Sequence, residues 1–203
     1  MKLYDDKRAP NPRRVRIFLA EKDIEVDTVN VDIMSEAHRN AENRALNPFE
    51  GVPFLVLDDG TVISETIAIC RYFEELSSDK PLFGKTPLEK AQIEMWQRRA
   101  ELGLFYTIAQ AFRHSNPYMV ELEKPQIAEW SQANLERIEG YLDKFEEALT
   151  HTPFVAGQGY SIADITTLVA IDFMRVLRLR LTDKHPKLLA WHALVSARSG
   201  SVK

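Results

Sequence analysis

The first third of the chain carries short, β-branched apolar runs separated by stretches in which apolar residues recur with helical spacing. Short or alternating apolar runs are typical of strands, and a recurrence every three to four residues is typical of helices. The order is strand, helix, strand, helix, strand, strand, helix, which predicts a small α/β layer. The predicted strands cover 2–4, 29–33, 52–57 and 61–63, with a tight turn at 58–60, and the best-defined helices cover 12–22 and 65–76.

After about residue 80 the pattern changes to helices alone. Residues 86–89 (TPLE) predict a capping box with proline at the first helical position, followed by a long helix to about Arg113. A second long helix is predicted over 126–149. Another capping box at 161–164 precedes a helix that is apolar nearly all round, which predicts a position at the centre of a bundle. We therefore predict an α/β domain over 1–79 and an all-α domain over 80–203.

Length, charge and cysteine content limit the function. A chain of 203 residues with 45% hydrophobic residues can bury a core and fold unaided. A net charge of -4 gives no basic stripe for nucleic acid, so no nucleic-acid partner is predicted. One cysteine excludes an internal disulfide and fits a reducing compartment. With no apolar signal core and no uncharged apolar run of about 20 residues, we expect a cytoplasmic protein without a membrane segment.

Asn11 stands between two prolines in the segment KRAPNPRRV. Asparagine is a preferred N-cap and proline a preferred first helical residue, so a plain helix start at Pro12 is one interpretation. A helix N-terminus also attracts anions, because unpaired N–H groups and the helix dipole point outward there. The flanking prolines would pre-organise such a site. The residues alone leave both interpretations open.

Two further segments combine strand ends with features of a ligand site. Pro53 opens an apolar strand, and a cis bond after Val52 would turn the Val52 backbone toward a peptide-like ligand. In a purely structural interpretation Ser64 caps the following helix and Glu65 complements its dipole. In a binding site, the Thr66 hydroxyl and the helix amides would hold a carboxylate while Glu65 would pair with an ammonium group. These two interpretations are equally supported.

The remaining reactive residue types show no pattern for a metal or a nucleophile. Cys70, in the middle of an apolar helix face, is interpreted as structural because it has no evident activating neighbour. The five histidines show no HExxH motif or paired spacing, so no metal site is predicted. Arg13, Arg14 and Arg16 are interpreted as a solvated helix face or as partners of acidic groups.

Four segments together resemble those of the cytosolic glutathione transferase family. They occur in order, at the spacing of the family, over nearly all of the chain. The resemblance implies a thioredoxin-like N-terminal domain, an all-helical C-terminal domain, glutathione as co-substrate without a metal, and a homodimer. It also implies detoxification of a small electrophile or reduction of a disulfide, and a structural role for Asp164 as the buried aspartate of the last capping box. The segments are NPRRVRIFLAEK, NPFEGVPFL, ISETIAICRYFEE and SIADITTLVAIDF.

The same resemblance implies which residues bind glutathione. Val52, before the expected cis Pro53, resembles the backbone partner of the cysteinyl unit. Glu65 and Thr66 resemble the Glu-Ser pair that holds the γ-glutamyl end. His38 stands where several classes place a basic residue near the glycyl carboxylate. The residues expected by position to contact the second substrate, and equally suited to the core or to an interface, are Arg99, Phe105 and Tyr106.

The expected activating residue differs from that of many family members. Ala9 and Pro10 occupy the positions of the usual serine or cysteine, and Tyr4 is out of phase with the catalytic tyrosine of the family. Asn11 resembles the asparagine of bacterial Nu-class and yeast-prion-like transferases, which makes it the catalytic candidate. Asparagine cannot take a proton, but a hydrogen bond that it donates to a thiolate would lower the thiol pKa by about one to two units.

The predicted function is therefore that of a glutathione transferase that stabilises the glutathione thiolate. This thiolate would attack an electrophilic carbon, or a disulfide or peroxide, since both reactions share the ionisation step. The alternative is a non-catalytic binding or scaffold protein that keeps the same fold. Retention on a glutathione resin separates the two, because a pure scaffold has no need of a tripeptide pocket.

Overall fold

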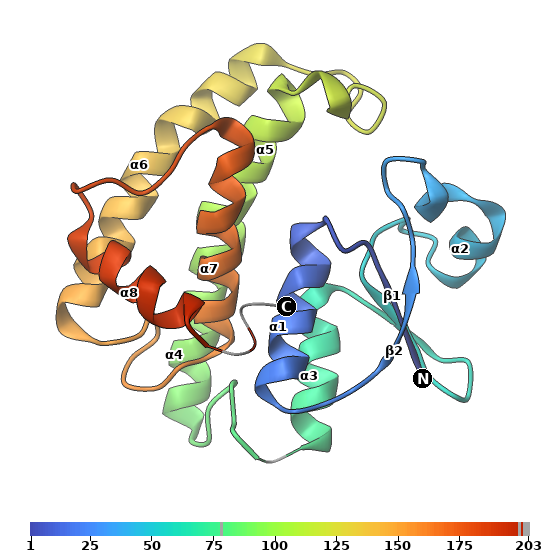
Figure 1. Cartoon of the computed structure of the whole chain (residues 1–203), viewed down its shortest axis with the longest axis horizontal. Helices are drawn as coiled ribbons and strands as arrows, with labels where there is room; N and C mark the ends of the chain where they lie inside the picture. Colours follow the sequence, from blue (N-terminus) through green and yellow to red (C-terminus); the bar gives the residue numbers. More distant parts are fainter. Residues whose placement is uncertain (78, 199, 201–203) are drawn as a thin grey trace. The chain divides into compact units, whose positions relative to one another are not determined.

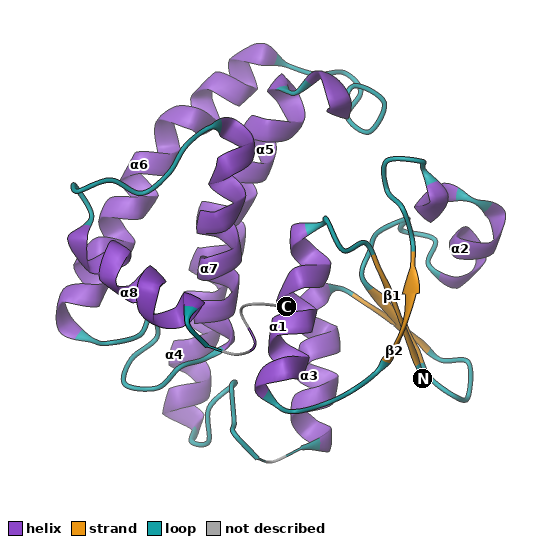
Figure 2. Cartoon of the chain, viewed as in Figure 1, coloured by secondary structure: helices purple, strands orange, loops and turns teal. Residues whose placement is uncertain are grey.

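The computed structural model describes residues 1–77, 79–198 and 200. The chain divides into two compact units, one of Met1–Pro81 that also takes in Gly200, and one of Leu82–Arg198. The first combines strands and helices and the second is helical (Figure 2). This confirms the predicted fold class. Among the described helices, none combines the length and the apolar character needed to cross a membrane.

The first unit is built on a four-stranded sheet of order β2-β1-β3-β4. β1 is parallel to β2 and antiparallel to β3, and β3 is antiparallel to β4. Tyr4 pairs with Phe54, and Phe54 pairs with Ser64, so the ends of β1 and β4 meet the start of β3 at one edge. The strands are β1 (Lys2–Asp5), β2 (Asp27–Asn30), β3 (Phe54–Val56) and β4 (Val62–Ser64).

The second strand differs from its prediction. The alternation of apolar residues predicted a strand over 29–33, but β2 ends at Asn30. The Val31 N–H still donates to the Asp5 carbonyl at 2.7 Å. Asp32 then closes a turn, because its carboxylate accepts a hydrogen bond from the backbone N–H of Met34 at 2.8 Å. The side chain of Asp32 thus competes with the strand for the backbone donors that follow.

Helices α1 and α3 lie side by side on one face of the sheet, and α2 lies on the other side (Figure 1). Their apolar faces form the core of the unit, in which Phe18 of α1 and Ile69 of α3 are fully buried. At the C-terminal end of α1, the buried Lys22 ammonium donates to Glu74 of α3 at 2.7 Å. The helices of this unit are α1 (Pro10–Glu21), η1 (Ala37–Arg39), α2 (Ala41–Leu46) and α3 (Thr66–Leu76).

The first long helix of the second unit begins as predicted but changes its winding. The Glu89 N–H donates to the Thr86 hydroxyl at 3.2 Å and the Thr86 N–H donates to the Glu89 carboxylate at 3.1 Å, which confirms the capping box. The prediction of a single α-helix to about Arg113 is wrong in part. The chain passes from α4 (Pro87–Arg98) through a π-helical segment, η2 (Arg99–Phe105), into α5 (Tyr106–Ser115).

The central helix of the second unit is α7 (Ile162–Phe173). Every residue from Ile162 to Ile171 is buried, which confirms the prediction from its all-round apolar pattern. It contacts α4, η2 and α8. The pattern did not predict α8. The other elements of this unit are η3 (Pro117–Met119), α6 (Ala128–His151), η4 (Met174–Leu177) and α8 (Pro186–Ser196).

Asp164 joins three segments of the second unit. Its fully buried carboxylate accepts hydrogen bonds from the Ser161 N–H and hydroxyl, from the Val155 N–H and from the Trp191 indole, all between 2.9 and 3.0 Å. Burial disfavours the charged form and raises the pKa of Asp164 to about 6, although the four donors partly oppose this effect. The residue thus connects the start of α7, the loop before it and α8.

The raised pKa of Asp164 predicts how the stability of the protein depends on pH. A carboxyl group whose pKa is higher in the folded protein stabilises the fold fully below its unfolded pKa of 3.8. This contribution is lost as the pH rises through about 6. The stability difference between wild type and Asp164→Asn should therefore shrink by about 3 kcal/mol between pH 3.5 and 7. Urea unfolding at several pH values measures it, and a difference independent of pH would contradict the prediction.

Candidate active site at the start of the first helix

The residues singled out in the first unit lie at one edge of its sheet. α1 follows the end of β1, α3 follows the end of β4, and the Val-Pro pair precedes β3. The strand register brings these three chain positions to the same edge. β2 is parallel to β1, so it ends at the same edge. The segment that contains η1 follows β2 in the chain and therefore starts from this edge too. The residues concerned are Asn11, His38, Val52, Pro53, Glu65 and Thr66.

The first turn of α1 differs from its prediction. The helix begins at Pro10 and its N-cap residue is Ala9, whose side chain makes no capping hydrogen bond. The interpretation of Asn11 as the N-cap is therefore wrong. Asn11 is the second residue of the helix, between two prolines whose restricted φ suits this first turn. The predicted start at Pro12 lies two residues late, because Pro10 also suits the first helical position and the capping preference of asparagine does not decide between the two prolines.

The two prolines leave a single backbone donor in this turn. Pro10 and Pro12 have no N–H group. The Ala9 N–H donates to the Asp6 carbonyl at 2.9 Å, and the Arg13 N–H donates to the Ala9 carbonyl at 3.3 Å. Within the described part of the chain, the Asn11 N–H has no hydrogen-bond acceptor. Asn11 is thus the residue through which the start of α1 can donate to a ligand.

The side chain of Asn11 is held by a buried arginine. Nη2 of Arg14 donates to Oδ1 of Asn11 at 2.7 Å, and Arg14 is only 2% exposed. The interpretation of Arg14 as part of a solvated helix face is therefore wrong. The other interpretation, that these arginines pair with acidic groups, is right for Arg16, which donates to the buried carboxylate of Asp5 at 2.6 Å. The residue pattern did not predict the contact of Arg14 with Asn11, although a spacing of three residues is that of helical neighbours.

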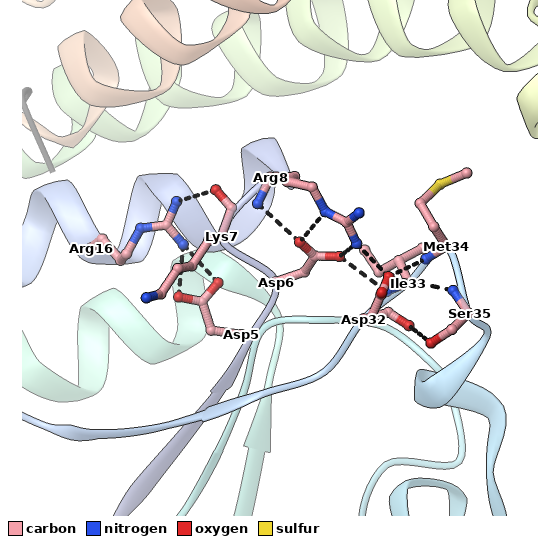
Figure 3. A network of polar contacts seen from close by, with 9 residues as sticks. All are labelled: Asp5, Asp6, Lys7, Arg8, Arg16, Asp32, Ile33, Met34 and Ser35. Carbon is pink, nitrogen blue, oxygen red and sulfur yellow. Dashed lines mark hydrogen bonds and ion pairs between the residues drawn. The ribbon is translucent and has the colours of Figure 1, made fainter.

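A polar network fixes the loop between β1 and α1 (Figure 3). The buried Asp6 carboxylate accepts hydrogen bonds from the Arg8 N–H at 2.9 Å, from Nε of Arg8 at 3.2 Å and from the Ile33 N–H at 3.0 Å. The Arg8 guanidinium also reaches Asp32. On the other side, Arg16 donates to the Lys7 carbonyl at 3.0 Å. The residue pattern did not predict this network, because Asp32 and Ile33 are far in sequence from Asp6 and Arg8.

The charge state of Asp6 follows from these contacts. Burial by itself would raise the pKa of Asp6, but the hydrogen bonds from the Arg8 side chain and from the backbone of Ile33 and Arg8 outweigh it. The pKa therefore lies below its usual value of 3.8. At neutral pH Asp6 is an ionised acceptor that holds the loop in place.

The second group of candidate residues at this edge is Val52 and Pro53. The peptide bond between them is cis, as expected from the sequence. Pro53 is buried and Val52 is half-buried. No hydrogen bond involves the backbone of Val52 among the residues that the structure describes. Its N–H and carbonyl are therefore available to a ligand with a peptide backbone.

The third group of candidate residues lies at the start of α3. Its N-cap residue is Glu65 and not Ser64, which is the last residue of β4, so the interpretation of Ser64 as the cap is wrong. Glu65 has a φ of 72°, a conformation that costs energy for a residue with a side chain and is found often at functional sites. Its side chain is exposed, whereas Thr66 is buried. Within the described residues the Thr66 hydroxyl has no hydrogen-bond partner.

His38 lies in η1 and is 7% exposed. Burial is the main cause that lowers the pKa of His38, and the nearby charge of Arg39 lowers it further. The imidazole is therefore neutral at pH 7, and a bound carboxylate would favour its protonation.

The three candidates for the second substrate lie in the second unit. Arg99 is exposed and its guanidinium lies 4.6 Å from the centre of the Trp96 ring. Phe105 is a core residue whose ring packs edge-on against Phe173, with centroids 5.9 Å apart. Tyr106 is 50% exposed. The role of these three residues stays a prediction, and Phe105 is the least accessible of them.

One group of possible metal ligands occurs in the described part of the second unit. Ligand atoms of Glu139, Asp143 and His185 lie within 4.8 Å of one another. Each already has a partner, since Nε2 of His185 lies 3.1 Å from the Asp143 carboxylate and Lys184 donates to Glu139 at 3.2 Å. These contacts account for the grouping without a metal ion.

Comparisons with known proteins find relatives over nearly the whole chain. The model of the glutathione S-transferase N-terminal domain matches residues 9–76, and that of the C-terminal domain matches residues 104–199. Glutathione S-transferase 2 of Saccharomyces cerevisiae is 36% identical over 98% of this chain and 86% of its own length.

Solved structures extend the likeness to the whole fold. A glutathione S-transferase domain-containing protein of Marinobacter aquaeolei VT8 superposes with a TM-score of 0.95 at 37% identity, covering 99% of this chain and 100% of that one. Gtt2 of Saccharomyces cerevisiae gives a TM-score of 0.93 at 36% identity, covering 100% and 99%.

The chain belongs to the glutathione S-transferase family. Its first unit is the thioredoxin-like domain of that family, and its second unit is the helical C-terminal domain. Membership supports a glutathione transferase function with glutathione as co-substrate.

Asp6 and Asp32 both contact Arg8, and we predict that their substitutions differ in their effect on the free energy of unfolding. Asp6→Asn should lower the free energy of unfolding at pH 7 by roughly 1.5–3 kcal/mol, because charge-assisted hydrogen bonds to a buried acceptor are lost. Because the pKa of Asp6 is lower in the folded protein, its ionised form stabilises the fold at pH values above the usual carboxyl pKa. This stabilisation is lost as the pH falls through the pKa that Asp6 has in the folded protein. The difference from wild type should therefore vanish in acid.

Asp32→Asn is the matched control. Asp32 contacts the same arginine from an exposed position, so its substitution should change stability much less. Urea unfolding of the three proteins between pH 3 and 7 measures both effects. Equal losses for the two substitutions would show that burial of Asp6 is not the cause.

Proposed function

We propose that the protein is a glutathione transferase in which Asn11 stabilises the thiolate of bound glutathione. The tripeptide lies along the edge described above, with its cysteinyl backbone on Val52. Its γ-glutamyl end meets Glu65 and Thr66, and its glycyl carboxylate lies near His38. Support comes from the family membership and from the unused hydrogen-bonding groups of Val52 and Thr66 at that edge.

The observation that carries the proposal is the concentration of donors on Asn11. Its backbone N–H has no acceptor among the described residues, and its side-chain oxygen faces Arg14, which leaves the side-chain NH2 for a ligand. A hydrogen bond to a charged acceptor contributes roughly 1.5–3 kcal/mol. The dipole of α1 adds about 0.3–1 kcal/mol. A free thiol has a pKa of about 8.5, so these effects produce a useful thiolate fraction near neutral pH.

The reaction begins with loss of the thiol proton to solvent. The thiolate then attacks an electrophilic carbon, forming a C–S bond while the leaving group departs with its electron pair. With a disulfide, the thiolate attacks one sulfur and expels the other as a thiolate. The thiolate of a second glutathione then attacks the glutathione sulfur of this mixed disulfide, expels the other half of the substrate as a thiolate and forms oxidised glutathione. The site contains no cysteine that could replace this second molecule, because Cys70 lies buried on α3.

Assembly and cellular setting are part of the same proposal. By analogy with the family, we propose a cytoplasmic homodimer that acts in detoxification on a small electrophile or disulfide, without a metal.

Substitution of Asn11 tests the mechanism. In Asn11→Ala the pKa of the bound thiol should rise by about one to two units, the equivalent of one charge-assisted hydrogen bond. Ultraviolet titration of the thiolate in the protein–glutathione complex measures this pKa. Thermal unfolding serves as the control, because Asn11 is not a cap and its loss should leave α1 intact.

Two results would contradict the proposal in different ways. An unchanged thiol pKa would remove Asn11 from the mechanism while leaving glutathione binding in place. Failure of the wild-type protein to bind glutathione at millimolar concentration would favour the alternative function, a non-catalytic scaffold with the same fold.

The role of Glu65 gives a separate expectation for substrate binding. Glu65→Gln keeps the size of the side chain and removes the charge that pairs with the γ-glutamyl ammonium. We expect the KM for glutathione to rise about tenfold, equivalent to about 1.4 kcal/mol, with little change in kcat. Glu75→Gln, an exposed glutamate at the other end of α3, is the matched control. Equal KM values for the two variants would place the ammonium elsewhere.

A further inference from the structure

We propose that Arg14 is a positioning residue that keeps the side-chain NH2 of Asn11 turned toward the glutathione sulfur. This inference rests on the proposed function and adds to it a residue that does not itself contact the sulfur. The effect of Asn11 on the sulfur depends on which end of its side-chain amide, the oxygen or the NH2 group, faces the ligand.

The orientation of an asparagine amide is not determined by its shape. The oxygen and the NH2 group are nearly equal in size, and a half-turn of the amide exchanges them. The two orientations have opposite effects on a thiolate. The NH2 group donates a hydrogen bond and stabilises the negative charge, whereas the carbonyl oxygen carries partial negative charge and repels it. An asparagine free to turn would therefore lose much of its effect.

Arg14 removes this ambiguity through its own chemistry. A guanidinium carries only donors and stays charged at every relevant pH. Whatever atom of Asn11 faces it at 2.7 Å must be the oxygen. Arg14 lies one turn further along α1, where helical spacing brings the two side chains together. Because Arg14 is buried, its contact with Asn11 is little weakened by competing water.

The arrangement makes Asn11 a two-point donor. Its backbone N–H is the one left available in the first turn of α1, and the NH2 group is left available by the bond to Arg14. The positive charge of Arg14 on the amide oxygen also polarises the amide and strengthens the NH2 group as a donor. Arg14 thus acts on the sulfur through Asn11.

The competing explanation is a direct effect of the arginine charge. A cation near the start of α1 would lower the thiol pKa whether or not Asn11 were present. A double-mutant cycle separates the two, because a positioning residue loses its effect when the residue that it positions is gone.

The experiment measures the thiol pKa of bound glutathione by ultraviolet titration in four proteins: wild type, Arg14→Met, Asn11→Ala and the double variant. Arg14→Met should lower the ionisation constant of the thiol about tenfold in the wild-type background, equivalent to one pKa unit. In the Asn11→Ala background the same substitution should change it by less than about twofold. Arg13→Met, which removes the same charge from the neighbouring residue of α1, is the control and should leave the constant near its wild-type value.

Each other result overturns the inference. An equal effect of Arg14→Met in both backgrounds would show direct action of the charge. A shift with Asn11→Ala but none with Arg14→Met would leave the proposed function standing and refute the role of Arg14. No shift in either variant would refute the role of Asn11 as well. If Arg14→Met does not fold, Arg14→Gln replaces it with the same expectation, since a glutamine amide can face Asn11 with either end and so does not impose one orientation.

Discussion

The hydrogen bonds to the buried Asp6 carboxylate hold the loop that leads into the first helix, and the candidate active site lies at the end of this loop. They tie the loop after β1 to Arg8 and to the backbone of Ile33, beyond the end of β2. The Asp6 carbonyl in turn accepts from the N-cap residue Ala9. The chain therefore enters α1 from a fixed point. An ionised carboxylate surrounded by donors is well suited to this, because such hydrogen bonds are about twice as strong as neutral ones.

Rigidity at this point matters because the proposed chemistry uses neutral donors. A base can act over a range of positions through water, but a hydrogen bond to a thiolate weakens steeply with a poor angle. The first turn of α1 is accordingly stiffened by Pro10 and Pro12, and the second residue is held by Arg14. Preorganised donors of this kind stabilise a developing charge without having to reorient during the reaction.

The second unit has its own organising group in Asp164. This buried carboxylate serves the folding of the helical unit, since all of its hydrogen-bond donors come from the start of α7, the loop before it and α8. Two buried aspartates in one chain thus differ in their pKa. Asp6 has an arginine beside it and a lowered pKa, whereas Asp164 has only neutral donors and a raised one. Whether the pKa of a buried carboxyl group is lowered or raised thus depends on whether a positive charge lies beside it.

The sequence by itself determined the features that rest on local or periodic interactions. The capping box at Thr86, the central position of α7 and the α/β character of the first unit follow from residues close together in the chain, and the glutathione transferase family follows from motifs of the same kind. Tertiary structure decided what depends on partners distant in sequence or on backbone geometry. The positive φ of Glu65, for example, cannot be predicted from a pattern of residue types. Asp6 holds the loop that leads into α1, and the buried Arg14 contacts the side-chain oxygen of Asn11. Arginine is usually a surface residue, so the sequence pattern does not predict that Arg14 is buried.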